Sequence, residues 1–228
     1  MTKMSNRDLV TPGTQIGKGN LRLREGVFRE GNEIFSSVVG LVDRRGNSIR
    51  VIPLAGAYIP NPGDRVIAMV TEVQFMGWMT FLRSPTPGIL KVGEVPQRFD
   101  PIEGNLVEIL ATGDLIFTEV ISVNKYMQIK LSMRDPQLRK LMGGRIFTID
   151  PVKVPRVIGR RGSMISMLKR AISEEIIVGQ NGIIWARCEN IEQEELLKRI
   201  LEKIEAESHT SGLTNRVKEI LKEEVGSG

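Results

Sequence analysis

Alternating hydrophobic and polar positions run through the first quarter of the chain and predict short β-strands. Two such runs, residues 34–42 and 49–54, lie on either side of a charged segment with glycine and asparagine at 43–47. Alternation with a period of two places every second side chain on one face of a sheet, and a glycine-containing turn between two runs favours a hairpin. We therefore predict a small N-terminal β-domain at residues 1–58.

Short strand-like runs recur after a boundary rich in proline and glycine at residues 59–64. Turn residues separate most of the runs, a pattern that is typical of a small closed barrel. We predict such a β-barrel at residues 59–135. Its expected strands cover residues 65–73, 78–83, 88–92, 106–110, 114–123 and 127–132.

The last segment, residues 145–228, mixes strand-like runs with apolar residues that recur every three or four positions. The second pattern indicates amphipathic helices. Gln180-Asn181-Gly182 lies between two apolar runs and is a strong hairpin signal. We predict an α+β domain with a strand at 146–149, a short helix at 154–158, a helix at 163–172, strands at 176–178 and 183–186, and helices at 191–206 and 214–224.

Cysteine and histidine are nearly missing from the 228 residues, and this limits the chemistry of the chain. Cys188 is the only cysteine, so an intrachain disulfide is impossible and we expect a cytoplasmic protein with this thiol packed in a core. His209 is the only histidine, which excludes most histidine-based catalysis. We predict no metal and no cofactor. No apolar run has the length of a membrane span.

Positive charge is concentrated in one place rather than spread along the chain. The net charge is +5, a mild indication of a polyanionic partner. Residues 151–170, however, contain six basic side chains and no acidic one. This basic segment surrounds the motif Gly-Arg-Arg-Gly at 159–162.

The motif Gly159-Arg160-Arg161-Gly162 is the strongest candidate for contact with a nucleic acid. Glycines permit a sharp turn, and without Cβ atoms they allow a nucleic-acid backbone to approach closely. Because the loop opens a predicted helix, free N–H groups and the positive end of the helix dipole face a phosphate there. The arginines add planar donors that suit phosphate, and Arg156 precedes them in the same basic segment.

The barrel segment contains aromatic side chains that are candidate platforms for base stacking. Stacking contributes about 1–3 kcal/mol per base and tolerates any sequence. Alternation along a strand sets Trp78 and Phe81 on opposite faces, so one of them belongs to the core; we favour Trp78 facing outward. The other candidate platforms are Phe75 and Tyr126. Phosphate contacts are expected from Arg65, Arg83, Lys91, Arg98 and Lys125.

Residues 157–165 resemble the signature of the KH domain, an RNA-binding module. The signature has aliphatic residues, then Gly-x-x-Gly, then an apolar residue three positions later, as at Ile165. The predicted order of strands and helices is that of a type I-like KH domain. The chain departs from the pattern in the helix before the loop, which is short and contains Pro155.

Residues 59–135 resemble the S1 motif, a five-stranded OB-fold barrel that binds single-stranded RNA. The resemblance lies in Gly63-Asp64 before the first strand, Gly77-Trp78 at the second, and the closing run at 129–134. Two features of the motif are different here. The phenylalanine usual in the second strand is replaced by Trp78-Met79, and the usual histidine after the third strand is missing.

Over its whole length the chain resembles one family, the archaeal exosome cap subunits of the S1-plus-KH type. The segments that carry this resemblance are 39–43, 51–54, 153–165, 180–185 and 207–214. The resemblance implies a non-catalytic subunit, of which three copies sit on a hexameric ring of RNase PH-like proteins that degrades RNA from its 3′ end with phosphate. The implied partners are single-stranded RNA, with A-rich 3′ tails favoured, and the ring subunits. In such an assembly the S1 barrels line the entry pore.

Two other functions are compatible with an S1 motif and a KH domain in one chain. A transcription elongation or antitermination factor also runs from S1 to KH, but such factors carry two tandem KH units, and only one fits in this chain. A phosphorolytic nuclease carries an RNA-binding tail in the reverse order, KH then S1, together with catalytic domains that are missing here. The sequence contains no plausible catalytic constellation, so an enzyme is not predicted.

Overall fold

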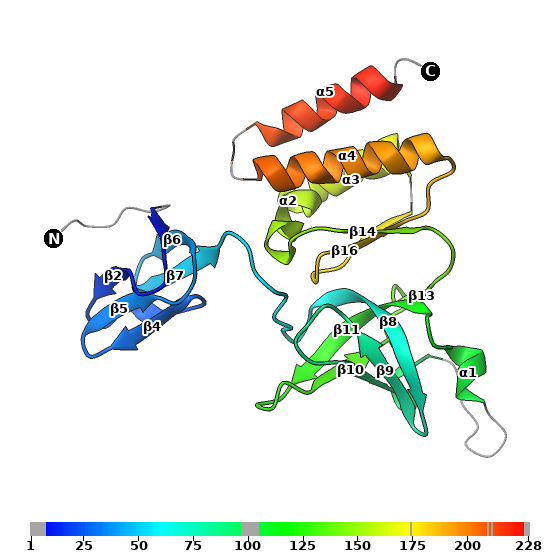
Figure 1. The fold of residues 1–228 in the computed structure, drawn as a ribbon, viewed down its shortest axis with the longest axis horizontal. Helices are drawn as coiled ribbons and strands as arrows, with labels where there is room; N and C mark the ends of the chain where they lie inside the picture. Colours follow the sequence, from blue (N-terminus) through cyan, green and yellow to red (C-terminus); the bar gives the residue numbers. More distant parts are fainter. Residues whose placement is uncertain (1–7, 97–104, 174, 209, 211, 226–228) are drawn as a thin grey trace. The chain divides into compact units, whose positions relative to one another are not determined.

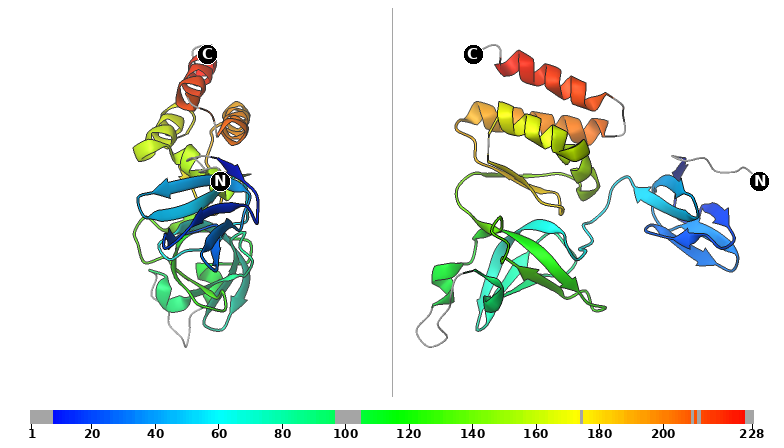
Figure 2. Two further views of the ribbon diagram at one scale, coloured as in Figure 1. Left: turned by 90° about the vertical axis from the view of Figure 1, so that its left-hand side faces the viewer. Right: turned by 180° about the vertical axis from the view of Figure 1, so that it is seen from behind.

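The computed structural model of the chain describes residues 8–96, 105–173, 175–208, 210 and 212–225 (Figure 1). The chain forms two compact units, residues 1–56 and 57–228. The described part of the first unit consists of β-strands and their connections. The second unit contains a β-barrel and an α+β domain, which can be followed from two further sides in Figure 2.

Two small sheets build the N-terminal unit. The first has the strand order β1 (Leu9–Val10), β6 (Gly40–Arg45), β7 (Ser48–Pro53) and β3 (Arg22–Leu23). The second has the order β2 (Gln15–Lys18), β5 (Glu33–Ser36) and β4 (Val27–Glu30). The predicted hairpin exists as β6 and β7, which turn at Gly46 with a φ of 55°. The prediction of one strand over 34–42 is wrong, because this run is divided between β5 of the second sheet and β6 of the first. Alternate side chains of both sheets, such as Ile34, Val42 and Val51, form the core of the unit.

Five strands close the predicted barrel. In spatial order they are β8 (Arg65–Gln74), β9 (Gly77–Phe81), β10 (Gly88–Lys91), β12 (Ile129–Ser132) and β11 (Leu115–Val123), and β11 pairs again with β8. The pairing of β10 with β12 is parallel and the others are antiparallel, which is the topology of an OB fold. The OB-fold prediction is confirmed. The interior is filled by apolar side chains that include Val66, Leu90 and Leu131.

The predicted strand at 106–110 is wrong, because these residues form the short helix α1 (Leu106–Ile109). A short apolar run does not by itself distinguish a strand from one helical turn. Here Asn105 decides the outcome, since its side chain accepts a hydrogen bond from the Val107 N–H and caps the helix. The turn directs Leu106 and Leu110 into the barrel core. The 3₁₀ turn η1 (Val92–Glu94) is the element that precedes α1 in the sequence.

The α+β domain has the predicted order of elements, and the KH prediction is confirmed. Its sheet has the order β14 (Arg145–Thr148), β16 (Ile183–Ala186) and β15 (Ile176–Val178). Its helices are α2 (Val154–Ile158), α3 (Ser163–Ala171), α4 (Ile191–Glu207) and α5 (Leu213–Val225), with 3₁₀ turns η2 (Pro151–Lys153) and η3 (Arg160–Gly162). Alternation directs Ile184 and Ala186 toward the helices and Ile183 and Trp185 toward the barrel.

An apolar layer joins the barrel to the KH domain. The sequence did not reveal β13 (Arg139–Leu141), which extends the barrel sheet by pairing with β11. Ile67 points outward from β8 and is nevertheless fully buried, because it packs with Leu141 and with Ile183 and Trp185 of the KH sheet. Burial of one such side chain contributes about 1.5–3 kcal/mol. The barrel and the KH domain therefore pack against each other through apolar side chains of their two sheets.

The hairpin turn between β15 and β16 is also a joint with the barrel. Strand β9 ends at Phe81, which pairs with Met69, so the backbone groups of Ile67 have no partner from β9. The fully buried Asn181 fills this gap: its Nδ2 donates to the Ile67 carbonyl at 2.7 Å and to the Leu82 carbonyl at 3.0 Å. Its Oδ1 accepts from the Ile67 N–H at 3.4 Å. A side chain of the KH domain thus completes the edge of the barrel.

We predict that Asn181→Ala destabilises the second unit by about 2–4 kcal/mol. The substitution leaves the Ile67 N–H and two carbonyls buried without partners, and each such group costs about 1–3 kcal/mol. The measurement is the free energy of unfolding of the full chain in denaturant, followed by tryptophan fluorescence.

Gln180→Ala is the matched control, because the Gln180 side chain is exposed and only its backbone N–H contacts the barrel, at the Arg65 carbonyl. We expect a change within about 0.5 kcal/mol for this variant, as for most surface substitutions. Equal free energies of unfolding for the two variants would contradict the structural role of Asn181.

Candidate nucleic-acid interface

The Gly-x-x-Gly loop has a backbone that ordinary residues rarely adopt. Gly159 has φ 74° and ψ 172°, a conformation that is essentially restricted to glycine. A Cβ atom at this position would lie 2.7 Å from both the N and the Cβ of Met164. Gly162 has φ 77° and ψ 13°, but a Cβ atom there would meet nothing closer than 3.8 Å. Steric contact therefore requires glycine at 159, and backbone conformation alone favours it at 162.

The two arginines inside the loop are presented to solvent. Arg160 and Arg161 are exposed, and Arg161 has the left-handed backbone conformation with φ 54° and ψ 31°. Such strained residues cluster at binding sites, where the surrounding structure maintains them. Arg156, on α2, is also exposed. Within the described residues none of these three side chains forms an ion pair, so their charges stay available for a partner.

The loop ends at the start of α3, and this helix start lacks a side-chain cap. Gly162 occupies the N-cap position and has no side chain to accept hydrogen bonds from the first turn. The Ser163 N–H donates to the Arg160 carbonyl, so an anion meets the later N–H groups of this turn and the positive end of the helix dipole. Beside the loop, Ile158, Ile165 and Val178 are half-buried against the KH core. The local chemistry suits a phosphate at the loop and an apolar part of a base next to it.

The prediction that Trp78 faces outward is wrong. Its side chain is fully buried in the barrel core, where Nε1 donates to the Leu110 carbonyl at 2.8 Å. The physical reason is the turn α1, which brings this acceptor inside the barrel and so satisfies the indole N–H without water. Trp78 and Phe81 do lie on opposite faces of the strand, as predicted. Trp78 is the inward side chain, and Phe81 points outward and is 50% exposed.

Phe81 belongs to an apolar strip that the sequence reading missed. On the outer face of the barrel Phe81 is paired with Met69, and Met79 is paired with Ile89. Met69 is exposed to 39%, while Met79 and Ile89 are half-buried. The signal was present in the sequence, because an inward Trp78 places Met79 on the outer face and Thr80 inside. Lys130, which is paired with Ile89, and Lys91 provide positive charge at this strip.

Two loops at the barrel carry the other predicted aromatic residues. Phe75 lies between β8 and β9 and is 91% exposed, and Met76 next to it is 58% exposed. Tyr126 lies between β11 and β12 and is 71% exposed, with the Lys125 Nζ 4.9 Å from its ring centre. Exposed rings of this kind are available for base stacking, and the lysine adds charge for phosphate. The predicted roles of these three residues remain predictions.

Arg65 and Arg83 are engaged by the protein itself. The Arg65 guanidinium forms an ion pair with Asp135 at 2.8 Å and donates to Gln137. Arg83 has the left-handed backbone conformation, and its Nη1 donates to the Ile149 carbonyl of the KH domain at 3.1 Å. We therefore expect these two arginines to organise the barrel and its joint, instead of binding phosphate.

Cys188, Arg98 and His209 are the other residues that the sequence singled out. Cys188 is half-buried against the KH core, and burial raises the pKa of its thiol, with a further contribution from Glu194. Arg98 and His209 lie outside the described residues. The described residues contain no group of side chains arranged to hold a metal ion. Among the described helices, none combines the length and apolar character that crossing a membrane requires.

A closed OB-fold barrel joined to a KH domain defines a class of multidomain proteins built from modules that bind single-stranded nucleic acid. Residues 7–55 match the family of N-terminal domains of the exosome RNA-binding protein RRP4, and residues 144–192 match the KH domain family. The exosome complex component Rrp4 of Methanothermus fervidus is 46% identical over 97% of this chain and 98% of its own length. That of Thermococcus kodakarensis is 44% identical over 94% of this chain and 85% of its own length.

A solved structure supports the same relationship. It is named as a candidate exosome complex RNA-binding protein, is 33% identical, and superimposes with a TM-score of 0.66 over 74% of this chain and 97% of its own. The chain belongs to the Rrp4 family of exosome complex components.

We predict that Gly159→Ala destabilises the KH domain more than Gly162→Ala does. Both substitutions place an alanine at positive φ, which costs about 1–2 kcal/mol. Only the first also forces a Cβ atom against the backbone of Met164, and we expect it to cost at least about 1 kcal/mol more. Denaturant unfolding of the two full-length variants measures the difference. A larger loss for Gly162→Ala would contradict the loop geometry.

Proposed function

We propose that the chain is a non-catalytic RNA-binding component of an exosome, which captures single-stranded RNA and delivers it to other subunits for degradation. The observation that carries this proposal is the loop from Gly159 to Gly162, where two exposed arginines stand at the uncapped start of α3. Membership of the Rrp4 family supports it, because the relatives are named as exosome complex components. No feature of the described residues specifically favours a transcription elongation factor.

The barrel supplies the second RNA contact in this proposal. The strip of Met69, Met79, Phe81 and Ile89 offers apolar contact to bases, and lysines flank it. Exposed rings at Phe75 and Tyr126 offer stacking at the ends of two loops. Stacking tolerates any base, so this surface suits the passage of many RNA sequences.

The assembly in this proposal follows the pattern of the family. Three copies of the chain cap a hexameric ring of RNase PH-like subunits in the cytoplasm, and their barrels surround the entry pore. The cap favours RNA with an A-rich 3′ tail and guides it into the ring, which degrades it phosphorolytically from 3′ to 5′. The N-terminal unit and the KH domain hold the cap on the ring.

We expect the double substitution Arg160→Glu with Arg161→Glu to weaken the binding of single-stranded RNA by the full chain. Affinity falls as salt rises, and loss of two phosphate contacts makes the slope of log affinity against log salt concentration less steep by about 1.4. Fluorescence anisotropy with a labelled oligoadenylate at several salt concentrations measures both quantities.

A matched control for this experiment is Arg24→Glu with Lys198→Glu, which changes the charge equally and leaves the loop and its basic segment intact. Arg24 is an exposed residue of the N-terminal unit and Lys198 is an exposed residue of α4. We expect this control to bind RNA clearly more tightly than the loop variant does. Unchanged affinity and salt dependence in the loop variant would overturn the role of the loop in RNA binding.

We expect the full chain to form a stable complex with a purified ring of RNase PH-like exosome subunits, in a ratio of three chains to one ring. Native mass spectrometry of the mixture measures the stoichiometry, with the ring alone and the chain alone as references. A mixture that contains only free ring and free chain would contradict the assembly proposed here.

A further inference from the structure

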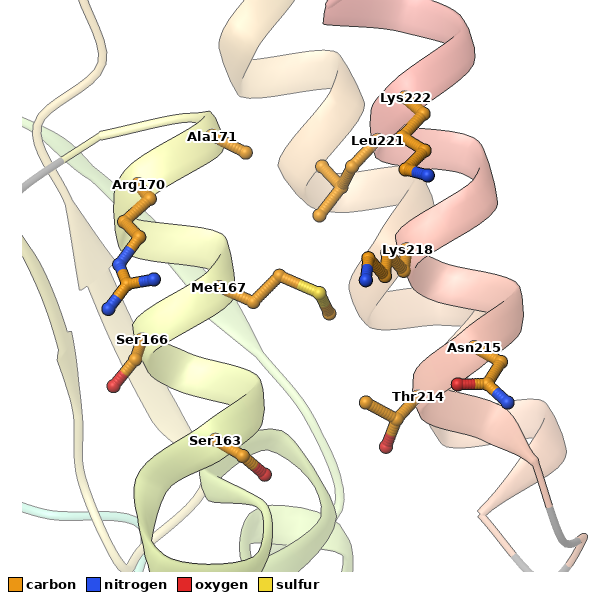
Figure 3. A pocket seen from close by; sticks show the side chains of 10 residues that line it. All are labelled: Ser163, Ser166, Met167, Arg170, Ala171, Thr214, Asn215, Lys218, Leu221 and Lys222. Carbon is orange, nitrogen blue, oxygen red and sulfur yellow. The ribbon is translucent and has the colours of Figure 1, made fainter.

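A groove of about 870 Å³ lies between α3 and α5, on a part of the KH domain that the proposed function does not use (Figure 3). Its polar lining consists of Ser163, Ser166, Arg170, Thr214, Asn215, Lys218 and Lys222. Among the described residues that line it, none is acidic. Hydroxyl, amide and cationic side chains of these types form most of the contacts that proteins make with phosphates and sugars of nucleic acids. The chemistry of the walls therefore suits a polyanion.

The two helices that form the groove run in the same direction. Ser163 and Thr214 lie at one end of it, and Ala171 and Lys222 lie at the other end (Figure 3). Both helix starts, where the dipoles are positive, are thus at the end marked by Ser163. Ser163 directly follows Gly162 in the sequence. The groove consequently begins where the arginine-bearing loop ends.

Positive charge continues from the loop along the groove. Lys218 and Lys222 are one helical turn apart, which separates them by about 6 Å along the axis of α5. Both are exposed, and within the described residues neither forms an ion pair. Figure 3 shows Lys218, Met167 and Leu221 directed into the space between the helices. The groove therefore has cations at one wall and an aliphatic floor.

The groove is distinct from the surface next to the Gly-x-x-Gly loop on the other side of α3. Ile165 and Met167 are two residues apart, so they point in directions about 200° apart around the helix axis. Ile165 lies next to the loop, where its Cγ2 is 3.8 Å from the position of a Cβ atom on Gly162, whereas Met167 faces α5. A strand that binds at the loop must continue around the start of α3 to enter the groove.

We propose that the groove between α3 and α5 binds the sugar–phosphate backbone of single-stranded RNA and extends the RNA site that begins at the Gly-x-x-Gly loop. Lys218 and Lys222 bind successive phosphates, and the hydroxyls of Ser163 and Thr214 bind the backbone where it leaves the loop. The aliphatic floor contacts sugars and base edges. Because phosphates and sugars are the same in every nucleotide, contacts of this kind read no sequence. This inference rests on the proposed RNA-binding function and assigns it a further contact surface.

The test compares the full-length chain with Lys218→Glu, Lys222→Glu and the double variant, using labelled RNA of about 4 and about 12 nucleotides. A KH loop clamps about four nucleotides, so only the longer RNA reaches the groove. We expect the double variant to bind the longer RNA about tenfold more weakly. The slope of its log affinity against log salt concentration becomes less steep by about 1.4. Its affinity for the short RNA stays within about twofold. The loss is the same for oligoadenylate and oligouridylate.

Lys198→Glu is the matched control for each single variant, since Lys198 is an exposed lysine of α4 that does not line the groove. The thermal unfolding of all variants is compared, so that a loss of fold is separated from a loss of binding. Equal weakening by Lys198→Glu, or unchanged affinity of the groove variant for the longer RNA, overturns the inference.

Two further results distinguish this inference from its alternatives. If the loop variant Arg160→Glu with Arg161→Glu loses RNA binding and the groove variant does not, the proposed function stands and the groove site is overturned. If the unaltered chain binds neither RNA, the proposed function itself fails. Polyglutamate serves as a probe for an acidic protein partner. Loss of polyglutamate binding with RNA binding retained assigns the groove to a protein and overturns the inference.

Discussion

The amide of Asn181 is the contact on which the arrangement of the second unit depends. The pairing of β9 with β8 ends at Phe81 and Met69, so backbone groups of Ile67 and Leu82 are buried without a partner from the neighbouring strand. Buried backbone groups without partners are costly, so something must supply them. The tip of the KH hairpin does so with one side chain, and the flanking backbone N–H of Gln180 donates to the Arg65 carbonyl. The turn that connects β15 and β16 within the KH domain thereby also binds the KH domain to the barrel.

This joint has a consequence for RNA binding. The short turn between β15 and β16 is committed to the barrel, so it is not a free loop beside the Gly-x-x-Gly segment. Arg83 reinforces the joint by donating to the Ile149 and Gly182 carbonyls. Since the barrel and the KH domain are held by an apolar layer and by these hydrogen bonds, their candidate RNA surfaces belong to one compact unit. Holding the two surfaces in place therefore requires no ordering of a linker, which would cost conformational entropy.

Charge and backbone conformation act together at the Gly159 to Gly162 loop. Glycine at 159 is needed because a Cβ atom would strike Met164, and the resulting turn holds Arg161 in a left-handed conformation. The start of α3 lacks a side-chain cap, so the loop leaves hydrogen-bond donors as well as charges for a ligand. The lysines of α5 extend the same positive field along the next groove. The KH domain therefore concentrates its binding chemistry around one helix.

The sequence by itself determined the order of modules, because strand alternation, helical periodicity and the Gly-x-x-Gly and Asn-Gly motifs are local signals. It also determined that Trp78 and Phe81 lie on opposite faces of one strand. Only the tertiary structure decided which of the two is inside, since the acceptor for the Trp78 indole is the distant Leu110 carbonyl. The same holds for Arg65 and Arg83, whose partners Asp135 and Ile149 are far away in sequence. Asn181 is the clearest case: its turn is readable from two neighbouring residues, but its buried hydrogen bonds depend on where β9 ends.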